Sequence, residues 1–487
     1  MADLLSVGRS GLSASKTGIE TTGHNLSNVN TEGFSRQRLI QTNNMPTLKN
    51  GMVQGSGVRV SGITRFNDIY IDKRLEGAIS EHNFNETKAS HLEQVEQVFS
   101  EINSEGLNTI LNRFYNAFRE LSNQPENETI RSVVRDSAKI VVKDFKRTRE
   151  SLNEITASMD TKLVQEIDDV NVMINNIARL NNTITNMEAS GDKVSDLKDQ
   201  RDLLVRNLSE SFGTNTYLDT KGQFTVNIIG VGTIISGTTV QELAAGRVGK
   251  EDSPYGSDGS VQVFLKERPT VSIGHKMSGG RISSLIKTRS EDIANFKKEI
   301  DDIAYEVVQT TNAIHRKGYV NRAIRIGPEG DPIQFDSKGK TTNINFFKAP
   351  DERLEAALKI ELSDEVKDDI SNIITAINPN SPGDNRISLA ISKLQHEKIF
   401  SEGTKTVEEQ YLSSVGRIGV LSGKAKIDAE QSEGIWTQAK SLRERLAGVS
   451  IDEETANLMK FQHAYEASAK MLKTADEMFD TVLNLKR

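Results

Sequence analysis

Apolar side chains recur at heptad spacing near both ends of the chain. At the N-terminal end, the residues that recur every seven positions are Leu5, Leu12, Ile19 and Leu26. Small residues such as Gly8 and Ser15 follow three positions later. Near the C-terminal end, two sets of residues alternate at spacings of three and four: Ile451, Leu458, Tyr465, Leu472 and Phe479, with Phe461, Ser468, Ala475 and Val482. Because a groove of small side chains matches a ridge of bulky ones, we predict that the terminal helices pair as a coiled coil.

The interior of the chain begins with long helices. Residues 126–190 contain neither Gly nor Pro, and a coiled-coil spacing of four and three runs through Leu163, Ile167, Val170, Ile174, Ile177, Asn181 and Ile184. This pattern predicts one very long helix, or two joined almost in line. Helical spacing returns over 293–314 and 407–425. A capping box of Ser450 and Glu453 predicts the start of the C-terminal helix.

Three glycines interrupt the predicted helix that starts near Val407. Gly416, Gly419 and Gly423 each cost about 1 kcal/mol of helix propensity relative to Ala. Their presence indicates a close approach of another helix, with local flexibility as the alternative.

The period changes to two in the middle of the chain. Phe224, Val226 and Ile228 alternate with polar residues, as do Val261 and Val263, with Gly-rich turns between them. This alternation predicts a small β unit over about 213–280.

Together these patterns predict a mainly α fold with a small β insertion. Helices at both ends and β strands in the middle describe a chain that runs out and doubles back, so its domains are nested and discontinuous. The predicted parts are a terminal coiled-coil inner domain with a hairpin extension at 1–64 and 440–487; a long-helix bundle at 65–212, 281–318 and 384–439; the β unit at 213–280; and a short outer appendage at 319–383.

Charge and hydropathy exclude two classes of partner. The chain carries 61 Lys and Arg against 68 Asp and Glu, a formal net charge of −7. The two signs are interspersed, so no basic stripe is present to bind nucleic acid. No 18-residue apolar run and no secretory signal pattern is found, so we expect neither membrane insertion nor a cleavable signal peptide.

Candidate catalytic chemistry is sparse. The chain has no cysteine and only 7 histidines, which are scattered without metal-ligand spacing. Ser13 and Lys16 have the S-x-x-K spacing of a nucleophile and base in some hydrolases, but no companion motif accompanies them. Trp436 is interpreted as a packed residue rather than a cofactor plate. We therefore predict no enzymatic activity, no metal and no cofactor.

Asparagines gather where the N-terminal helix must end. The amides of Asn25, Asn28 and Asn30 can satisfy free helix carbonyls and bond to adjacent subunits, which would fix register. After Gly33, "FSRQRLIQT" alternates like an edge strand, and "GVRVSGITR" answers it as the second strand of a hairpin. Bonding within one subunit and bonding between subunits both remain open.

Two stretches at opposite ends resemble signatures of the bacterial flagellar rod, hook and hook-associated proteins. "NLSNVNTEGFSRQR" from Asn25 to Arg38 is similar to their N-terminal signature, and "VSIDEETANLMKFQHAYEASAKMLKTADEMFDTVL" from Val449 to Leu483 to their C-terminal one. Three interior stretches resemble the hook-associated members of the family: "DLKDQRDLLVRNLSE", "GGRISSLIKTRSEDI" and "PGDNRISLAISKLQ".

The resemblance implies a structural axial protein, located outside the cell, whose subunits form a ring that joins the hook to the filament. It implies as partners further copies of the chain, the hook protein, hook-associated protein 3, and the flagellar type III export apparatus with its chaperone. The alternative is another axial component, such as hook-associated protein 3 or the hook protein. The assembly seam would then comprise Leu5, Leu12, Ile19, Leu26, Leu458, Phe461, Tyr465, Leu472, Phe479 and Val482, and the polar register would comprise Asn25, Asn28 and Asn30.

The thin terminal seam also predicts folding on assembly. A seam of Gly, Ser and Thr buries little apolar area against a cost of order 1 kcal/mol or more per ordered residue. We therefore expect the terminal segments to order only when neighbouring subunits assemble. The competing classes are an unrelated coiled-coil scaffold, which would be a stable dimer in dilute solution, and an enzyme that depends on Ser13.

Overall fold

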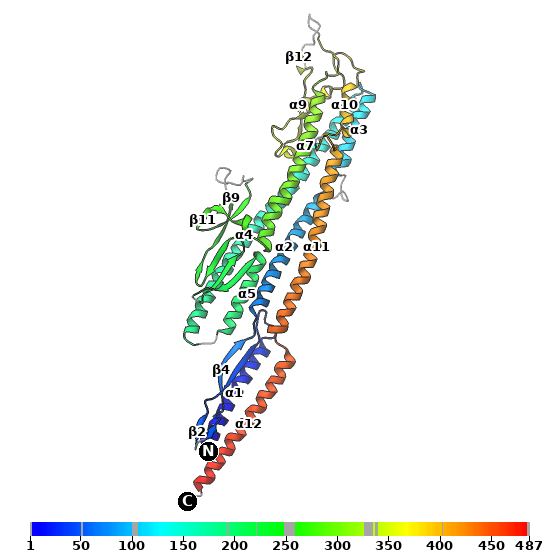
Figure 1. The fold of residues 1–487 in the computed structure, drawn as a ribbon. Helices are drawn as coiled ribbons and strands as arrows, with labels where there is room; N and C mark the ends of the chain where they lie inside the picture. Colours follow the sequence, from blue (N-terminus) through cyan, green and yellow to red (C-terminus); the bar gives the residue numbers. More distant parts are fainter. Residues whose placement is uncertain are drawn as a thin grey trace. The chain divides into compact units, whose positions relative to one another are not determined.

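The chain has a mainly α fold with small antiparallel sheets (Figure 1), which confirms the predicted fold class. The computed structural model describes residues 2–49, 52–99, 106–191, 194–220, 222–247, 259–325, 335–336, 339–401 and 403–484. Two compact units are present, one comprising residues 1–84, 164–283 and 430–487 and the other residues 85–163 and 284–429. Among the described helices, none combines the length and hydrophobicity that a membrane crossing requires.

The first unit contains both terminal helices and most of the strands. Its elements are α1 (Ala2–Ser27), β1 (Gln37–Asn43), β2 (Thr47–Lys49), β3 (Met52–Gln54), β4 (Val58–Arg65), α5 (Ser195–Ser211), β5 (Thr214–Leu218), β6 (Phe224–Ile228), β7 (Gly232–Ser236), β8 (Thr239–Val240), β9 (Leu243–Arg247), β10 (Val261–Leu265), β11 (Arg268–Ser272) and α12 (Ile451–Asn484). The predicted hairpin is confirmed, because β1 and β4 pair antiparallel with Leu39 opposite Ile63.

The second unit contains shorter helices around a buried core. Its elements are α3 (Leu107–Asn123), α7 (Ala294–His315), β12 (Phe335–Asp336), β13 (Gly339–Lys340), β14 (Phe347–Lys348), α8 (Ala356–Lys359), β15 (Glu361–Leu362), α9 (Asp364–Asp368) and α10 (Arg386–Lys393). The boundaries between the units fall inside α2 (Ile69–Phe99), α4 (Glu128–Ala189), α6 (Gly280–Lys287) and α11 (Val407–Ala447).

The helix α4 confirms the prediction of one very long helix, with 62 residues. Its predicted seam residues from Leu163 to Ile184 are all buried. In the first unit this helix supports the β strands through asparagine side chains. Asn171 Nδ2 donates to the carbonyl of Leu243 at 2.8 Å, and Asn181 Nδ2 donates to the carbonyl of Gly237 at 2.9 Å.

The predicted β unit is confirmed as two small sheets. One has the strand order β5-β6-β7-β8 and the other β11-β10-β9. Val226, Ile228, Val261 and Val263 are buried, as the period of two predicts.

The core of the second unit combines α3 and α7 with parts of residues 319–383. Phe114 and Phe118 of α3 contact Phe346 with ring centroids 5.8 and 5.3 Å apart. Buried His315 of α7 accepts a hydrogen bond at Nε2 from the backbone N–H of Ile374 at 2.9 Å. Residues 326–334 and 337–338 of the predicted appendage lie outside the described residues.

The glycines of α11 have no close neighbour in the described chain. A methyl group added at Gly416, Gly419 or Gly423 would meet no described atom within 4 Å. The predicted close approach of another helix is therefore wrong for the described residues. These glycines lie away from the buried face of α11, which includes Tyr411 and Ile418.

Candidate assembly site

The two terminal helices pair antiparallel through glycines. α1 and α12 lie side by side (Figure 1). A methyl group on Gly8 would lie 3.1 Å from Cγ of Leu472, and one on Gly18 would lie 2.5 Å from the ring of Phe461. The helices are antiparallel because residue numbers rise along α1 as those of their partners fall along α12. Bulky α12 side chains thus occupy space that only glycine leaves open on α1.

Small residues, rather than the heptad of large ones, form the buried part of α1. The buried residues are Gly8, Ala14, Ser15, Gly18, Thr21, Thr22 and Asn25. The predicted seam residues that are half-buried are Leu5, Leu12, Ile19, Leu26, Leu458, Phe461, Leu472 and Phe479. Tyr465 and Val482 are exposed, by 37% and 48%. The structure brings Phe461 and Leu472 against α1, and the wider role of these residues as an assembly seam stays a prediction.

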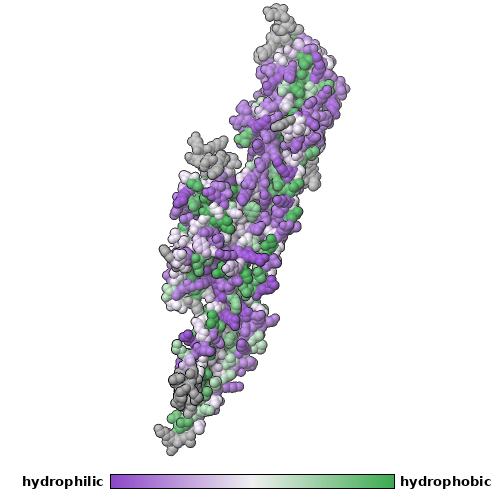
Figure 2. Space-filling model, viewed as in Figure 1, coloured by the Kyte–Doolittle hydropathy of each residue, from purple (hydrophilic) through white to green (hydrophobic). Residues whose placement is uncertain are grey.

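The helix α12 is mostly exposed. Among its described residues only Glu454 and Ala475 are buried. Met459, Met471 and Met478 are among the exposed apolar side chains, and Figure 2 shows hydrophobic residues scattered over the surface of the terminal helices. The pairing with α1 therefore leaves apolar surface of α12 uncovered.

Asn25 joins the end of α1 to the hairpin and to α12. Its Nδ2 donates to the carbonyl of Gln37 at 2.8 Å and to Glu454 at 2.9 Å, and its Oδ1 accepts from the N–H of Gln37 at 2.9 Å. The amide thus imitates a strand neighbour for Gln37. Because the side chain is only 1% exposed, these bonds are shielded from water, and they connect three segments of the chain.

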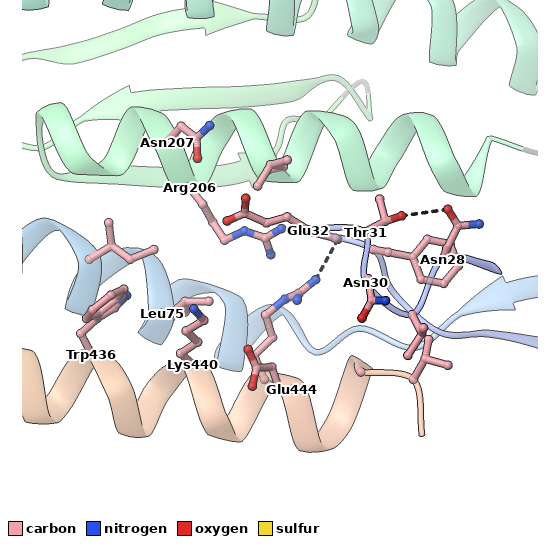
Figure 3. Close-up of a pocket in the computed structure, with 18 of the residues that line it drawn as sticks. Asn28, Asn30, Thr31, Glu32, Leu75, Arg206, Asn207, Trp436, Lys440 and Glu444 are labelled. Carbon is pink, nitrogen blue, oxygen red and sulfur yellow. Dashed lines mark hydrogen bonds between the residues drawn. The ribbon is translucent and has the colours of Figure 1, made fainter. Parts of the chain in front are cut away.

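The other two asparagines lie in the turn after α1. Asn28 Nδ2 donates to the carbonyl of His24 at 3.0 Å, and its Oδ1 accepts from Thr31 Oγ1 at 3.1 Å (Figure 3). Asn28 therefore caps the C-terminal end of α1. Asn30 is exposed. The structure brings Asn25 and Asn28 into bonds within the subunit and leaves the side chain of Asn30 at the surface.

Arg36 connects the hairpin to the start of α12. Its guanidinium bonds to Glu453 at 2.6 Å and to Glu454 at 2.7 Å, and its backbone N–H donates to the carbonyl of Ala447 at 2.8 Å. Glu454 is only 2% exposed. A buried carboxylate needs such charged and amide donors, so Glu454 depends on both Arg36 and Asn25.

Acidic residues of α5 hold the base of the hairpin. Asp199 accepts from the backbone N–H of Ser35 at 3.0 Å and from Arg65 at 2.9 Å, and Asp202 pairs with Arg65 at 2.7 Å. Gln37 Nε2 donates to Asp196 at 2.6 Å. The two ends of the hairpin are therefore tied to one helix.

The turn of residues 28–34 also lines a hollow of about 510 Å³ (Figure 3). Arg443 of α11 donates to the carbonyl of Gly33 at 3.0 Å there. Trp436 packs against a buried cluster that includes Leu75 and Ile79 and stacks on His82 with ring centroids 4.9 Å apart. These contacts describe a packed structural joint between the turn, α2 and α11.

Sequence reasoning missed four residues that connect the hairpin to α12 and to α5. They are Arg36, Arg65, Asp199 and Glu454. Glu454 is one of three acidic residues in the first turn of α12, where a negative charge is common without any specific partner. A signal was present in the arginine-rich end of the "FSRQR" stretch, because buried arginines need acidic partners.

Both residues of the S-x-x-K pair lie at the surface of α1. Lys16 lies on the exposed side of α1, 3.8 Å from Glu20, and Ser13 is also exposed. Within the described ranges, no group of three or more His, Cys, Asp or Glu side chains could hold a metal ion.

Comparison with known proteins gives two matches to family models. Residues 92–325 match the flagellar hook-associated protein FlgK helical domain. Residues 445–485 match the flagellar basal body rod FlgEFG protein C-terminal model.

Similar proteins span almost the whole chain. A flagellar hook-associated protein 1 of Bacillus subtilis (strain 168) is 29% identical over 518 residues, which cover 99% of this chain and 97% of the relative. One from Salmonella typhimurium (strain LT2) is 24% identical over the full length of both chains. The solved flagellar hook junction protein FlgK of Burkholderia pseudomallei has the same fold, with a TM-score of 0.63 at 13% identity over 78% of this chain and 100% of that one.

Proposed function

The chain belongs to the family of flagellar hook-associated protein 1, and on that premise we propose that it is a structural axial protein of the bacterial flagellum. Its subunits form a ring that joins the hook to the filament. The observation that carries the proposal is the joint of Asn25, Arg36 and Glu454, which unites the two terminal signatures in one site.

Assembly supplies the burial that the terminal helices lack in one subunit. Since α12 buries only Glu454 and Ala475 among its described residues, a single chain gains little free energy from ordering it. Contacts with neighbours stabilise the ordered form by mass action. Premature polymerisation at low concentration is disfavoured for the same reason.

The neighbours of the ring are further copies of this chain, the hook protein on one side and hook-associated protein 3 on the other. The chain reaches this extracellular position through the flagellar type III export apparatus, with its chaperone. Its role there is mechanical and not catalytic, which is supported by the similarity to flagellar hook-associated proteins.

Purified protein added to isolated hooks of its own species tests the proposal. We expect rings at the distal ends of the hooks by electron microscopy, and filament growth once hook-associated protein 3 and flagellin are added. A protein that forms a stable dimer in dilute solution and does not bind to hooks would indicate an unrelated coiled-coil scaffold. Growth of hook-like tubes, or binding only after another junction protein, would indicate the hook protein or hook-associated protein 3.

A further inference from the structure

The paired terminal helices have two unlike faces, and we propose that the bulky face of one copy packs against a small-residue face of α12 in the next copy. This inference rests on the proposed function and names the residues through which neighbouring subunits of the ring touch.

The bulky face lies on the side away from the hairpin. It includes Leu5, Leu12, Ile19, Leu26, Leu458 and Tyr465, which are half-buried or exposed. The hairpin marks the other side of α1, where the N–H of Val58 donates to Ser10 Oγ at 3.3 Å. Leu12 follows Ser10 by two positions, which places it roughly 160° around the helix from the hairpin contact.

The small-residue face lies on the hairpin side of α12. Its small residues are Ala464, Ala467 and Thr474, and the long, flexible side chains of Lys460, Met471 and Met478 flank them, all exposed. Each of Lys460, Ala467 and Met471 precedes a residue that contacts α1, namely Phe461, Ser468 or Leu472, so this face is turned by about 100° from α1.

A groove marks one end of the small-residue face. At the Lys460 end, this groove of about 620 Å³ is bounded by α1 at Gly18 and by β1 at Leu39 and Gln41. It offers room for side chains from a neighbouring helix. At the other end, Thr474 and Met478 lie on open surface of α12.

The two faces are complementary in size and period. Within the chain, the bulky Phe461 and Leu472 already pack on glycines of α1. The proposed contact repeats this arrangement between copies. The α1 ridge recurs every seven residues and the α12 face at spacings of four and three, so both fit one continuous coiled-coil seam. Ala464 and Ala467 permit close approach, and the flexible Met471 and Met478 adapt to the incoming side chains.

A second copy is the occupant because one chain presents both halves of the contact. Since the halves differ, the contact is heterologous, and its repetition gives a closed ring or an open helix. α1 has 26 residues, so a strip about 39 Å long and ~10 Å wide would bury only about 400 Å² per copy, below the ~800 Å² per partner of a standard stable interface. Two copies therefore separate in dilute solution, and many contacts acting together hold the ring.

Cysteine cross-linking tests the contact directly, because the natural chain contains no cysteine. Full-length Leu12→Cys protein is mixed with Ala464→Cys, Ala467→Cys or Met471→Cys protein, assembled on isolated hooks and oxidised. We expect a disulfide-linked dimer of the two variants, with at least one of the three positions giving a yield at least fivefold above that of Ser13→Cys. Ser13 is the matched control because it is exposed on α1 and lies about 100° around the helix from Leu12.

A second pair of variants keeps the test decisive if a cysteine variant does not assemble. Ala467→Leu should lower ring formation at least tenfold while leaving the thermal unfolding of the monomer unchanged, because Ala467 is exposed in the single chain. Glu466→Leu, at an exposed position of α12 that lies about 80° or more around the helix from every α12 residue of the two faces, should assemble normally. Equal cross-linking of Ser13→Cys and Leu12→Cys, or unhindered assembly of Ala467→Leu, would overturn the inference. Failure of the wild-type chain to bind hooks would instead overturn the proposed function.

Discussion

Glu76 on α2 is a buried carboxyl group with an unsatisfied oxygen. The residue is 7% exposed, and its Oε2 has no hydrogen-bond partner among the described residues. Burial, followed by the nearby charges of Asp72 and Asp202, raises the pKa of Glu76 to about 8. The folded chain therefore keeps this proton at neutral pH, whereas an unfolded chain releases it near the ordinary pKa of 4.5.

We predict that Glu76→Gln removes a loss of stability at alkaline pH. The stabilising effect of the bound proton is fully present below the unfolded pKa and is lost as the pH rises through about 8. The melting temperature of the wild type should fall more steeply than that of Glu76→Gln between pH 6 and pH 9, measured by circular dichroism. Glu81→Gln, an exposed change on the same helix, is the control. Parallel curves for the wild type and Glu76→Gln would contradict the prediction.

We also predict that Asn25→Ala weakens the terminal joint while Asn30→Ala does not. Asn25 makes three hydrogen bonds in a buried site. Its loss would remove these partners from Gln37 and leave Glu454 bonded to Arg36 without the amide, at a cost of about 1–3 kcal/mol for each buried group left unpaired. Asn30 is exposed. The protein concentration at which rings begin to form should rise at least tenfold for Asn25→Ala and stay unchanged for Asn30→Ala. An equal effect of the two changes would mean that Asn25 does not fix the register.

At the scale of the element, glycine decides the pairing of α1 with α12. Gly18→Ala would place a methyl group 2.5 Å from the ring of Phe461, so Phe461 must move out of the groove. At Gly23, also inside α1, the same change meets no described atom within 4 Å and favours the helix by about 1 kcal/mol. We predict that Gly18→Ala impairs assembly on hooks and that Gly23→Ala preserves it. If Gly18→Ala protein assembled normally on hooks, the space that Gly18 leaves for Phe461 would not be needed for assembly.

Periodicity predicted the elements well but not which face each helix buries. The spacing of four and three identified α4 because buried Ile and Val residues mark its contact directly. On α1 the heptad of large residues from Leu5 to Leu26 predicts the contact face, yet Gly8 and Gly18 form close contacts with α12. A glycine carries no hydropathy signal. Whether it permits a close helix contact depends on the side chain that faces it, which one sequence does not identify.

The polar joint could not be predicted for a related reason. Arg36 and Glu454 are separated by 418 positions, and each alone is an ordinary surface residue type. Only the fold places them together, because α1 and α12 are antiparallel and the hairpin returns beside the start of α12. The N-terminal signature indicated that residues 25–38 are functionally important. The three-dimensional structure identified the ion pairs of Arg36 with Glu453 and Glu454.

At the scale of the whole chain, burial is uneven. The helix α7 of the second unit buries Phe296, Ile300, Ile303 and Val307. By contrast, α12 of the first unit buries only Glu454 and Ala475 among its described residues. Because local stability follows the number of buried apolar contacts, the terminal pair should be the part that opens at lowest cost in free energy.

Hydrogen exchange followed by mass spectrometry tests this difference. In dilute monomer, we predict that the amides of α1 and α12 exchange at least 100-fold faster than those of α7, because their helices open without disturbing the buried core. In rings assembled on hooks, α1 and α12 should gain protection while α7 changes little, since neighbours then cover the exposed faces. The deeply buried α7 serves as the internal control in both states. If α12 in the monomer were as protected as α7, the terminal pair would already be stable alone, and assembly would have to be controlled by something other than the ordering of these two helices.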